Sequence, residues 1–162
     1  MPISSHSDTA WTGRHDGDGP EHARWHQAVQ VVAGPRDAAA DPASDHVALL
    51  GFRSEEGVRR NRGRVGAADG PAALRRALAP LALHGPLAEG TVGLHDLGDA
   101  ETVGEDLEAG QAAAAALTSA ALDRAGSRLA VVLGGGHGTA WSSYLGLVGS
   151  GLGPRAGQRW GC

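Results

Sequence analysis

The chain has 162 residues, a hydrophobic fraction of 41%, only 4% aromatic residues and a formal net charge of -4 at pH 7. A chain of this length forms one ordinary domain that buries roughly two-thirds of its unfolded surface. Its 14 positive charges are all arginines and form no basic run, which argues against nucleic acid or an anionic membrane as a partner.

The first 20 residues, MPISSHSDTAWTGRHDGDGP, lack the order of a secretory signal, in which basic residues precede an apolar run and a small-residue cleavage site. No apolar run approaches the roughly 20 residues that a membrane span needs. The single cysteine, Cys162, excludes a disulfide framework and a CxxC metal site. The sequence therefore predicts a cytoplasmic protein.

Regular structure is expected to begin after residue 45, because the preceding segment is polar and ends in the loop-like AGPRDAAADPASD. The run HVALLGF at 46–52 is typical of a strand buried on both faces of a parallel sheet. We therefore divide the chain into a polar segment and linker (1–45), an α/β region (46–150) and a tail (151–162).

A loop, GVRRNRGRVG, follows this strand, and a helix follows the loop. Pro71 suits the first turn of that helix and Pro80 ends it. One helical face carries Leu74, Ala77 and Leu78. These residues complete a first unit of strand, loop and helix.

A second unit begins with TVGLHDLGD at 91–99, which is interpreted as a strand. Thr102 and Glu105 have the spacing of a capping box. An alanine-rich helix should run from there to about residue 125, with Gly126 as its left-handed stop. Its buried stripe is expected to consist of Leu107, Ala114, Leu117 and Ala121.

The third unit is the strand RLAVVL at 128–133, followed by three glycines and a helix. Four residues have helical spacing in that helix: Trp141, Tyr144, Leu145 and Val148. Strands that alternate with helices predict a right-handed parallel α/β sheet of about three strands and three helices.

His137 follows Gly134, Gly135 and Gly136 at the end of the third strand. A dinucleotide-binding turn would need a sixth-position glycine where Thr139 stands, and a Walker A loop would need a lysine. An esterase would need a GxSxG elbow, which the chain lacks. Two interpretations remain: a histidine satisfied in a buried turn, or a metal ligand.

The position of His137 favours the metal ligand, because open α/β sheets bind their ligands at the carboxyl ends of the strands. The glycines would let the backbone turn sharply, so that the imidazole projects into the cleft.

Four motifs occur along the chain in an order that is specific for one family. The amino-terminal motif is WTGRHDG with EHARWHQAV, the second is GVRRNRGRVGAADGPAALR, and the others are LGGGH and GHGTAWSSYLGL. LGGGH resembles the first metal-binding motif of the ureohydrolases, the arginase and agmatinase superfamily. The other three are similar to segments of the formimidoylglutamases. The resemblance runs from about Trp11 to about Gly161.

The resemblance implies the amino-terminal half of a three-layer α/β/α parallel sheet of the arginase type. It also implies two manganese ions and a bridging hydroxide that attacks the amidine carbon of N-formimidoyl-L-glutamate, giving L-glutamate and formamide in histidine degradation. Metal coordination makes hydroxide available near neutral pH, and imidazole and carboxylate ligands suit manganese. His137 would be the first ligand. A small-molecule amidine would be the substrate, and a homo-oligomer is compatible with the family.

The loop GVRRNRGRVG offers Arg59, Asn61 and Arg64 as substrate-binding residues, because forked guanidinium groups can clamp carboxylates. The alternative is an exposed basic loop solvated by water. Trp11 and Trp25 are expected to anchor the amino-terminal segment by packing.

The remaining ligands of the family lie in DAHxD and DxDxxDP motifs, which this sequence does not contain. Two substitutes, HDGDGPEH at 15–22 and HDLGD at 95–99, are expected to be structural. Gly138 also departs from the formimidoylglutamases, which usually carry an acidic residue there. The tail is expected to reflect a truncated or frameshifted chain.

Three functions stay open at this point: a formimidoylglutamase, a ureohydrolase that acts on a guanidinium compound such as agmatine, and a non-catalytic fragment or interaction partner. A lone imidazole should bind manganese weakly, so the 162-residue chain is expected to be inactive by itself. The third strand is expected to leave an open apolar edge.

Overall fold

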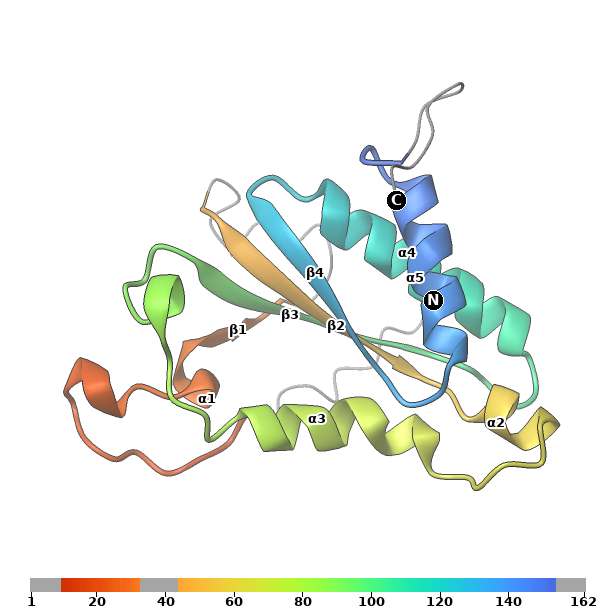
Figure 1. Ribbon diagram of the computed structural model, residues 1–162, viewed down its shortest axis with the longest axis horizontal. Coiled ribbons are helices and arrows are strands. Elements are labelled where there is room, and N and C mark those ends of the chain that lie inside the picture. The colour runs from red at the N-terminus through yellow and green to blue at the C-terminus, as the bar shows by residue number, and fades with distance from the viewer. Residues whose placement is uncertain (1–9, 33–43, 154–162) are drawn as a thin grey trace.

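In the part of the chain that the structure describes, four parallel strands form one sheet in the order β1-β3-β2-β4 (Figure 1). The computed structural model describes residues 10–32 and 44–153. The strands are β1 (Val29–Val31), β2 (His46–Arg53), β3 (Gly93–Glu101) and β4 (Ser127–Gly134). The three longer strands coincide with the three predicted apolar runs, and their parallel pairing confirms the predicted α/β class.

Helices cover both faces of this sheet (Figure 1). They are α1 (Trp25–Ala28), α2 (Glu56–Arg60), α3 (Gly70–Leu78), α4 (Leu107–Asp123) and α5 (Gly138–Gly149), with 3-10 turns at Pro20–His22, Ala67–Asp69 and Gly85–Leu87. α3 lies on one face and α4 on the other, and α5 packs on α4. The helices and the sheet make the predicted three-layer α/β/α arrangement. No helix in the described part of the chain is long and apolar enough to cross a membrane.

The prediction that regular structure begins after residue 45 is wrong, because α1 and β1 precede it. β1 pairs with β3 from Val29 opposite Leu94 to Val31 opposite Asp96. A strand of three residues, VQV, is too short to produce a periodic signal of its own. Likewise, α2 occupies part of the segment predicted as a loop.

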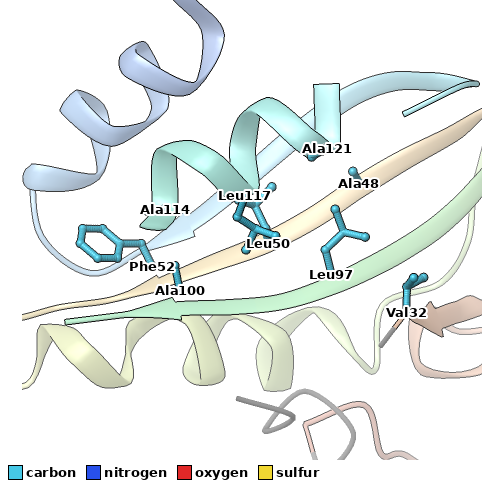
Figure 2. Packing of buried hydrophobic residues seen from close by; sticks show 9 residues of the cluster. All are labelled: Val32, Ala48, Leu50, Phe52, Leu97, Ala100, Ala114, Leu117 and Ala121. Carbon is cyan, nitrogen blue, oxygen red and sulfur yellow. The ribbon is translucent and has the colours of Figure 1, made fainter. Parts of the chain in front are cut away.

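The core between the sheet and α4 follows the predicted pattern (Figure 2). Ala48, Leu50 and Phe52 alternate along β2 and point to α4, where buried positions recur at helical spacing. These positions are Ala114, Leu117 and Ala121, and Leu107 packs partly buried against the same cluster. Three of the four expected stripe residues are therefore fully buried.

The start of α4 differs from the predicted capping box. Asp106 caps the helix, and its carboxylate accepts a hydrogen bond from the backbone N–H of Ala109 at 3.0 Å. Thr102 instead donates its hydroxyl to Ser54 Oγ at 2.8 Å. Gly126 has φ +79°, the left-handed conformation expected after the helix.

The buried face of α3 differs from the predicted one. Leu74 and Ala77 are exposed, whereas Pro71 and Arg75 are buried. Ala79, which directly follows the last residue of α3, is also buried. Arg75 is 1% exposed, because two carboxylates of β3 neutralise and hydrogen-bond its guanidinium group. A hydrophobic pattern cannot reveal this rotation, since it counts arginine as a surface residue.

A β-bulge brings these two carboxylates to the same face of β3. Residues three apart in a regular strand point to opposite faces, yet Asp96 and Asp99 both reach Arg75. Gly98 between them has φ +80°, and the pairing register with β2 shifts there. The extra residue therefore reverses the alternation of β3 after Asp96.

In α5, the residues with helical spacing do not form a buried stripe. Trp141, Tyr144 and Val148 are 54%, 51% and 40% exposed. The face turned to α4 instead carries Ser142 and Gly146. A Cβ at Gly146 would lie only 2.5 Å from Thr118 Cβ of α4. Only small residues permit this close helix packing.

Candidate functional site

A cavity of about 340 Å³ lies at the carboxyl ends of β2 and β4. Phe52 and Ser54 line it from the end of β2, and Asn61 lines it from the loop after α2. His137 and Thr139 contribute from the turn before α5 and from its first residues. The structure therefore brings two predicted site residues, Asn61 and His137, to one cavity at the edge where parallel sheets bind ligands.

Close packing constrains two of the three glycines before His137, Gly134 and Gly135. None of Gly134, Gly135 and Gly136 is among the described residues with positive φ, so the predicted sharp turn does not use a left-handed conformation. A Cβ on Gly135 would collide with the carbonyl oxygen of Ala67, and one on Gly134 would collide with the Thr139 hydroxyl. These contacts hold the turn against the loop that precedes α3.

His137 occupies the cap position of α5 with helical backbone angles, φ -61° and ψ -18°, and its side chain is exposed. The backbone N–H groups of Thr139 and Ala140 donate to the carbonyls of Gly136 and His137 at 3.1 Å, which close the first turn. The imidazole is thus presented on a short, tightly connected segment between β4 and α5.

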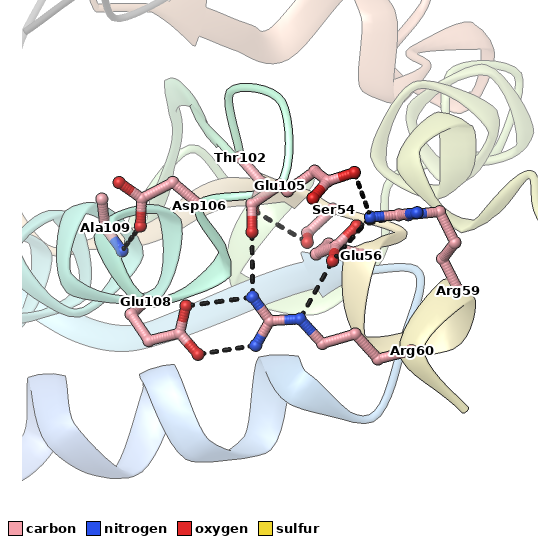
Figure 3. Close-up of polar contacts among 9 residues, drawn as sticks. All are labelled: Ser54, Glu56, Arg59, Arg60, Thr102, Glu105, Asp106, Glu108 and Ala109. Atoms are coloured by element: carbon pink, nitrogen blue, oxygen red, sulfur yellow. Dashed lines mark hydrogen bonds and ion pairs between the residues drawn. The ribbon is translucent and has the colours of Figure 1, made fainter. Parts of the chain in front are cut away.

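Arg59 lies apart from this cavity, in a network of ion pairs (Figure 3). Its Nε donates to Glu56 at 2.7 Å, and its Nη2 lies 2.9 Å from a carboxylate oxygen of Glu105. The hydrogen bond from Arg59 holds the pKa of Glu56 below its usual range. Arg59 lines a second cavity, of about 200 Å³, which it shares with Arg53 and Glu101.

Arg60 extends the network to α4 (Figure 3). Its guanidinium group donates to Glu108 at 2.6 and 3.1 Å and to Glu56 at 2.9 Å. The network ties α2 to the beginning of α4, and both elements border the cavity that contains His137. Arg64, the third predicted substrate-binding residue, is exposed and lines neither of these two cavities.

The described residues supply one candidate metal ligand at the cavity, His137. They contain no group of three or more His, Cys, Asp or Glu side chains that could hold a metal ion. A two-manganese centre needs several such ligands, so the described residues do not complete one.

The two acidic segments considered as substitutes make structural contacts. In HDLGD, Asp96 and Asp99 bind Arg75 inside the protein, and burial raises the pKa of Asp99. In HDGDGPEH, Asp16 pairs with Arg14 and Arg24, and the hydrogen bond from Arg14 lowers the pKa of Asp16. The carboxylates of Asp16, Asp96 and Asp99 are therefore paired with arginines.

Ser54 and Thr139 were not predicted as site residues. Each hydroxyl lies within a few residues of a strand end: Ser54 directly follows β2, and Thr139 lies in the first turn of α5 after β4. The signal that could have found them is this position at the carboxyl edge of the sheet.

Comparison with known proteins gives a family and a set of similar chains. The model of the Arginase family matches residues 45–154. Formimidoylglutamase of Nocardia farcinica (strain IFM 10152) is 49% identical over 140 residues, which are 86% of this chain and 41% of that protein. Formimidoylglutamase of Rhodococcus jostii (strain RHA1) is 46% identical over 138 residues, 85% of this chain and 39% of that protein. The chain therefore spans about 40% of the length of these relatives.

Proposed function

Because the chain belongs to the arginase family, we propose that it forms part of a hydrolase that cleaves N-formimidoyl-L-glutamate to L-glutamate and formamide. The observation that carries this proposal is the cavity at the carboxyl edge of the sheet, where Asn61 and His137 lie together. The relatives named formimidoylglutamase favour this amidine over the guanidinium group of agmatine.

In this proposal His137 holds one of two manganese ions through its imidazole. Bound manganese would supply a nucleophilic hydroxide near neutral pH. Since the described residues provide this single ligand at the cavity, we assign no catalytic step to them. We expect the 162-residue chain to bind manganese weakly and to show no hydrolysis by itself.

Asn61 is proposed to orient the substrate. Its amide carries two N–H donors and one acceptor oxygen, which suit a substrate with both carboxylate and amidine groups. The first turn of α5 lies at the same cavity, and the positive end of its dipole favours a carboxylate. Arg64 lines neither cavity, so the proposal gives it no contact with the substrate. Arg59 could bind the substrate carboxylate only if it gave up its ion pair with Glu56 or Glu105.

Binding can be tested without turnover by following the Asn61 side-chain amide and the His137 ring by NMR. We expect N-formimidoyl-L-glutamate to shift these signals at lower concentration than agmatine does. Asn61→Ala should weaken binding roughly 10-fold, the value of one hydrogen bond of about 1–1.5 kcal/mol. His84→Ala, at an exposed position outside the cavity, is the matched control.

Stronger binding of agmatine would favour a guanidinium substrate. Saturation with neither compound would favour a non-catalytic interaction role. A separate assay for formamide release with added manganese tests the expected inactivity. Turnover that disappears in His137→Ala would contradict that expectation.

A further inference from the structure

Two histidines stack inside the protein at the end of the sheet opposite the cavity. His46 is the first residue of β2 and His95 the third of β3, and strand alternation places His46 with Ala48 on the face covered by α4. Their ring centroids are 4.3 Å apart, with 22° between the ring planes. The two residues are 0% and 2% exposed, so water does not solvate either ring.

Each ring has a buried nitrogen that can accept a proton but has no hydrogen-bond partner in the described parts of the chain. These atoms are His46 Nε2 and His95 Nδ1. The other nitrogen of His46, Nδ1, donates to the carbonyl oxygen of Ser44 at 3.0 Å, which fixes the orientation of that ring. Proton uptake at His95 Nδ1 would bury an N–H donor and a charge without an acceptor among the described residues.

Among the described residues, no carboxylate contributes to the shift of the His95 pKa, whereas Asp45 interacts with His46. Asp45, beside His46, forms an ion pair with Arg128 of β4 at 2.6 Å. Arg124 follows α4 and adds a positive charge near His95. Burial, assisted by the positive charge of Arg124, lowers the pKa of His95 to about 4.

The same place connects the beginnings of three strands. The backbone N–H of His46 donates to the carbonyl of Gly126 before β4 at 2.9 Å, and that of Gly93 at the start of β3 donates to Asp45 at 2.8 Å. A displacement of His46 would therefore loosen β2 from both of its neighbours.

We propose that the stacked His46–His95 pair is an acid-sensitive joint of the sheet, which is closed while the His95 ring is neutral and opened by proton uptake on that ring. The folded state binds this proton less tightly than the unfolded chain does. The joint therefore contributes its full stability above about pH 6.5, the ordinary pKa of histidine. This contribution is lost as the pH falls towards 4.

The test is urea unfolding of the whole chain between about pH 7.5 and 4.5, comparing the wild type with His95→Phe. Phenylalanine keeps an aromatic ring in the stack but cannot take up a proton. Over this pH range, we expect the equilibrium constant for folding to fall on the order of 50- to 100-fold more in the wild type than in His95→Phe. His84→Phe, at an exposed histidine, should keep the wild-type dependence.

Equal losses in the wild type and His95→Phe would overturn the proposal. If His95→Phe does not fold, the imidazole NMR signals of the wild type decide the matter. A His95 ring that stays neutral at pH 5, with faster amide exchange at His46 and Leu94 than at Leu50 and Phe52 as the pH falls, supports the joint. A ring that titrates near 6.5 without faster exchange there contradicts it.

Discussion

Arg75 and Asp96 form a two-point ion pair inside the protein, with Nε to Oδ2 at 2.7 Å and Nη2 to Oδ1 at 2.8 Å. Trp11 donates its indole N–H to the same carboxylate at 2.6 Å, and Asp99 accepts from Arg75 Nη1 at 2.6 Å. The cluster joins α3, β3 and the amino-terminal segment. Trp11, with 8% exposure, is thus the packing anchor expected from the sequence.

Asp96→Ala should destabilise the protein by about 3–5 kcal/mol, because it leaves a buried guanidinium charge without its main partner. Urea unfolding at neutral pH measures the loss. Arg76→Ala removes the neighbouring exposed arginine of α3 and should leave stability nearly unchanged. Similar losses of unfolding free energy in both variants would show that the buried ion pair stabilises the protein no more than an exposed arginine does.

Gly98→Ala should cost about 1–2 kcal/mol, since a side chain is strained at φ +80°. The bulge that aligns Asp96 with Asp99 depends on this conformation. Gly149→Ala is the control, because a Cβ there meets open space at the end of α5. Thermal unfolding should show a lower midpoint for Gly98→Ala only, and an unchanged midpoint would mean that the bulge tolerates a side chain.

Gly135→Ala should cost about 1–3 kcal/mol by forcing the turn away from Ala67. The displacement should also alter the NMR signals of the His137 ring and weaken ligand binding at the cavity. Gly138→Ala, where a Cβ lies 3.4 Å from Gln111 Nε2, should be tolerated. Identical His137 signals in Gly135→Ala and the wild type would contradict the packing role of the glycine.

Leu129→Lys should reduce self-association without a loss of stability. Within the described residues β4 pairs with β2 alone, and Leu129 on it is 54% exposed. An unpaired apolar strand edge favours pairing with another chain, and a lysine opposes it. Light scattering over a range of concentrations measures the change, with Val103→Lys, at 73% exposure in the loop before α4, as the control. A monomeric wild type would contradict the prediction.

Local patterns along the chain were sufficient to predict much of the fold. The apolar run of β2 is continuous because both faces of the sheet are covered there, whereas the equally apolar β4 at the sheet edge is only partly buried. The stripe containing Ala114 and Leu117 follows from the helical period, and the place of His137 follows from its position after a buried strand. Each of these features depends on residues that are close together in sequence.

The tertiary structure alone decided which polar side chains meet. Arg75 is buried because a bulge at Gly98 turns two carboxylates towards it. Arg59 is bound by Glu56 and Glu105, whereas Asn61, two residues further on, reaches the cavity. Apart from the Arg59–Glu56 pair within α2, these outcomes depend on contacts between distant segments, where charge pairing and close backbone approach outweigh the local pattern of polar and apolar residues.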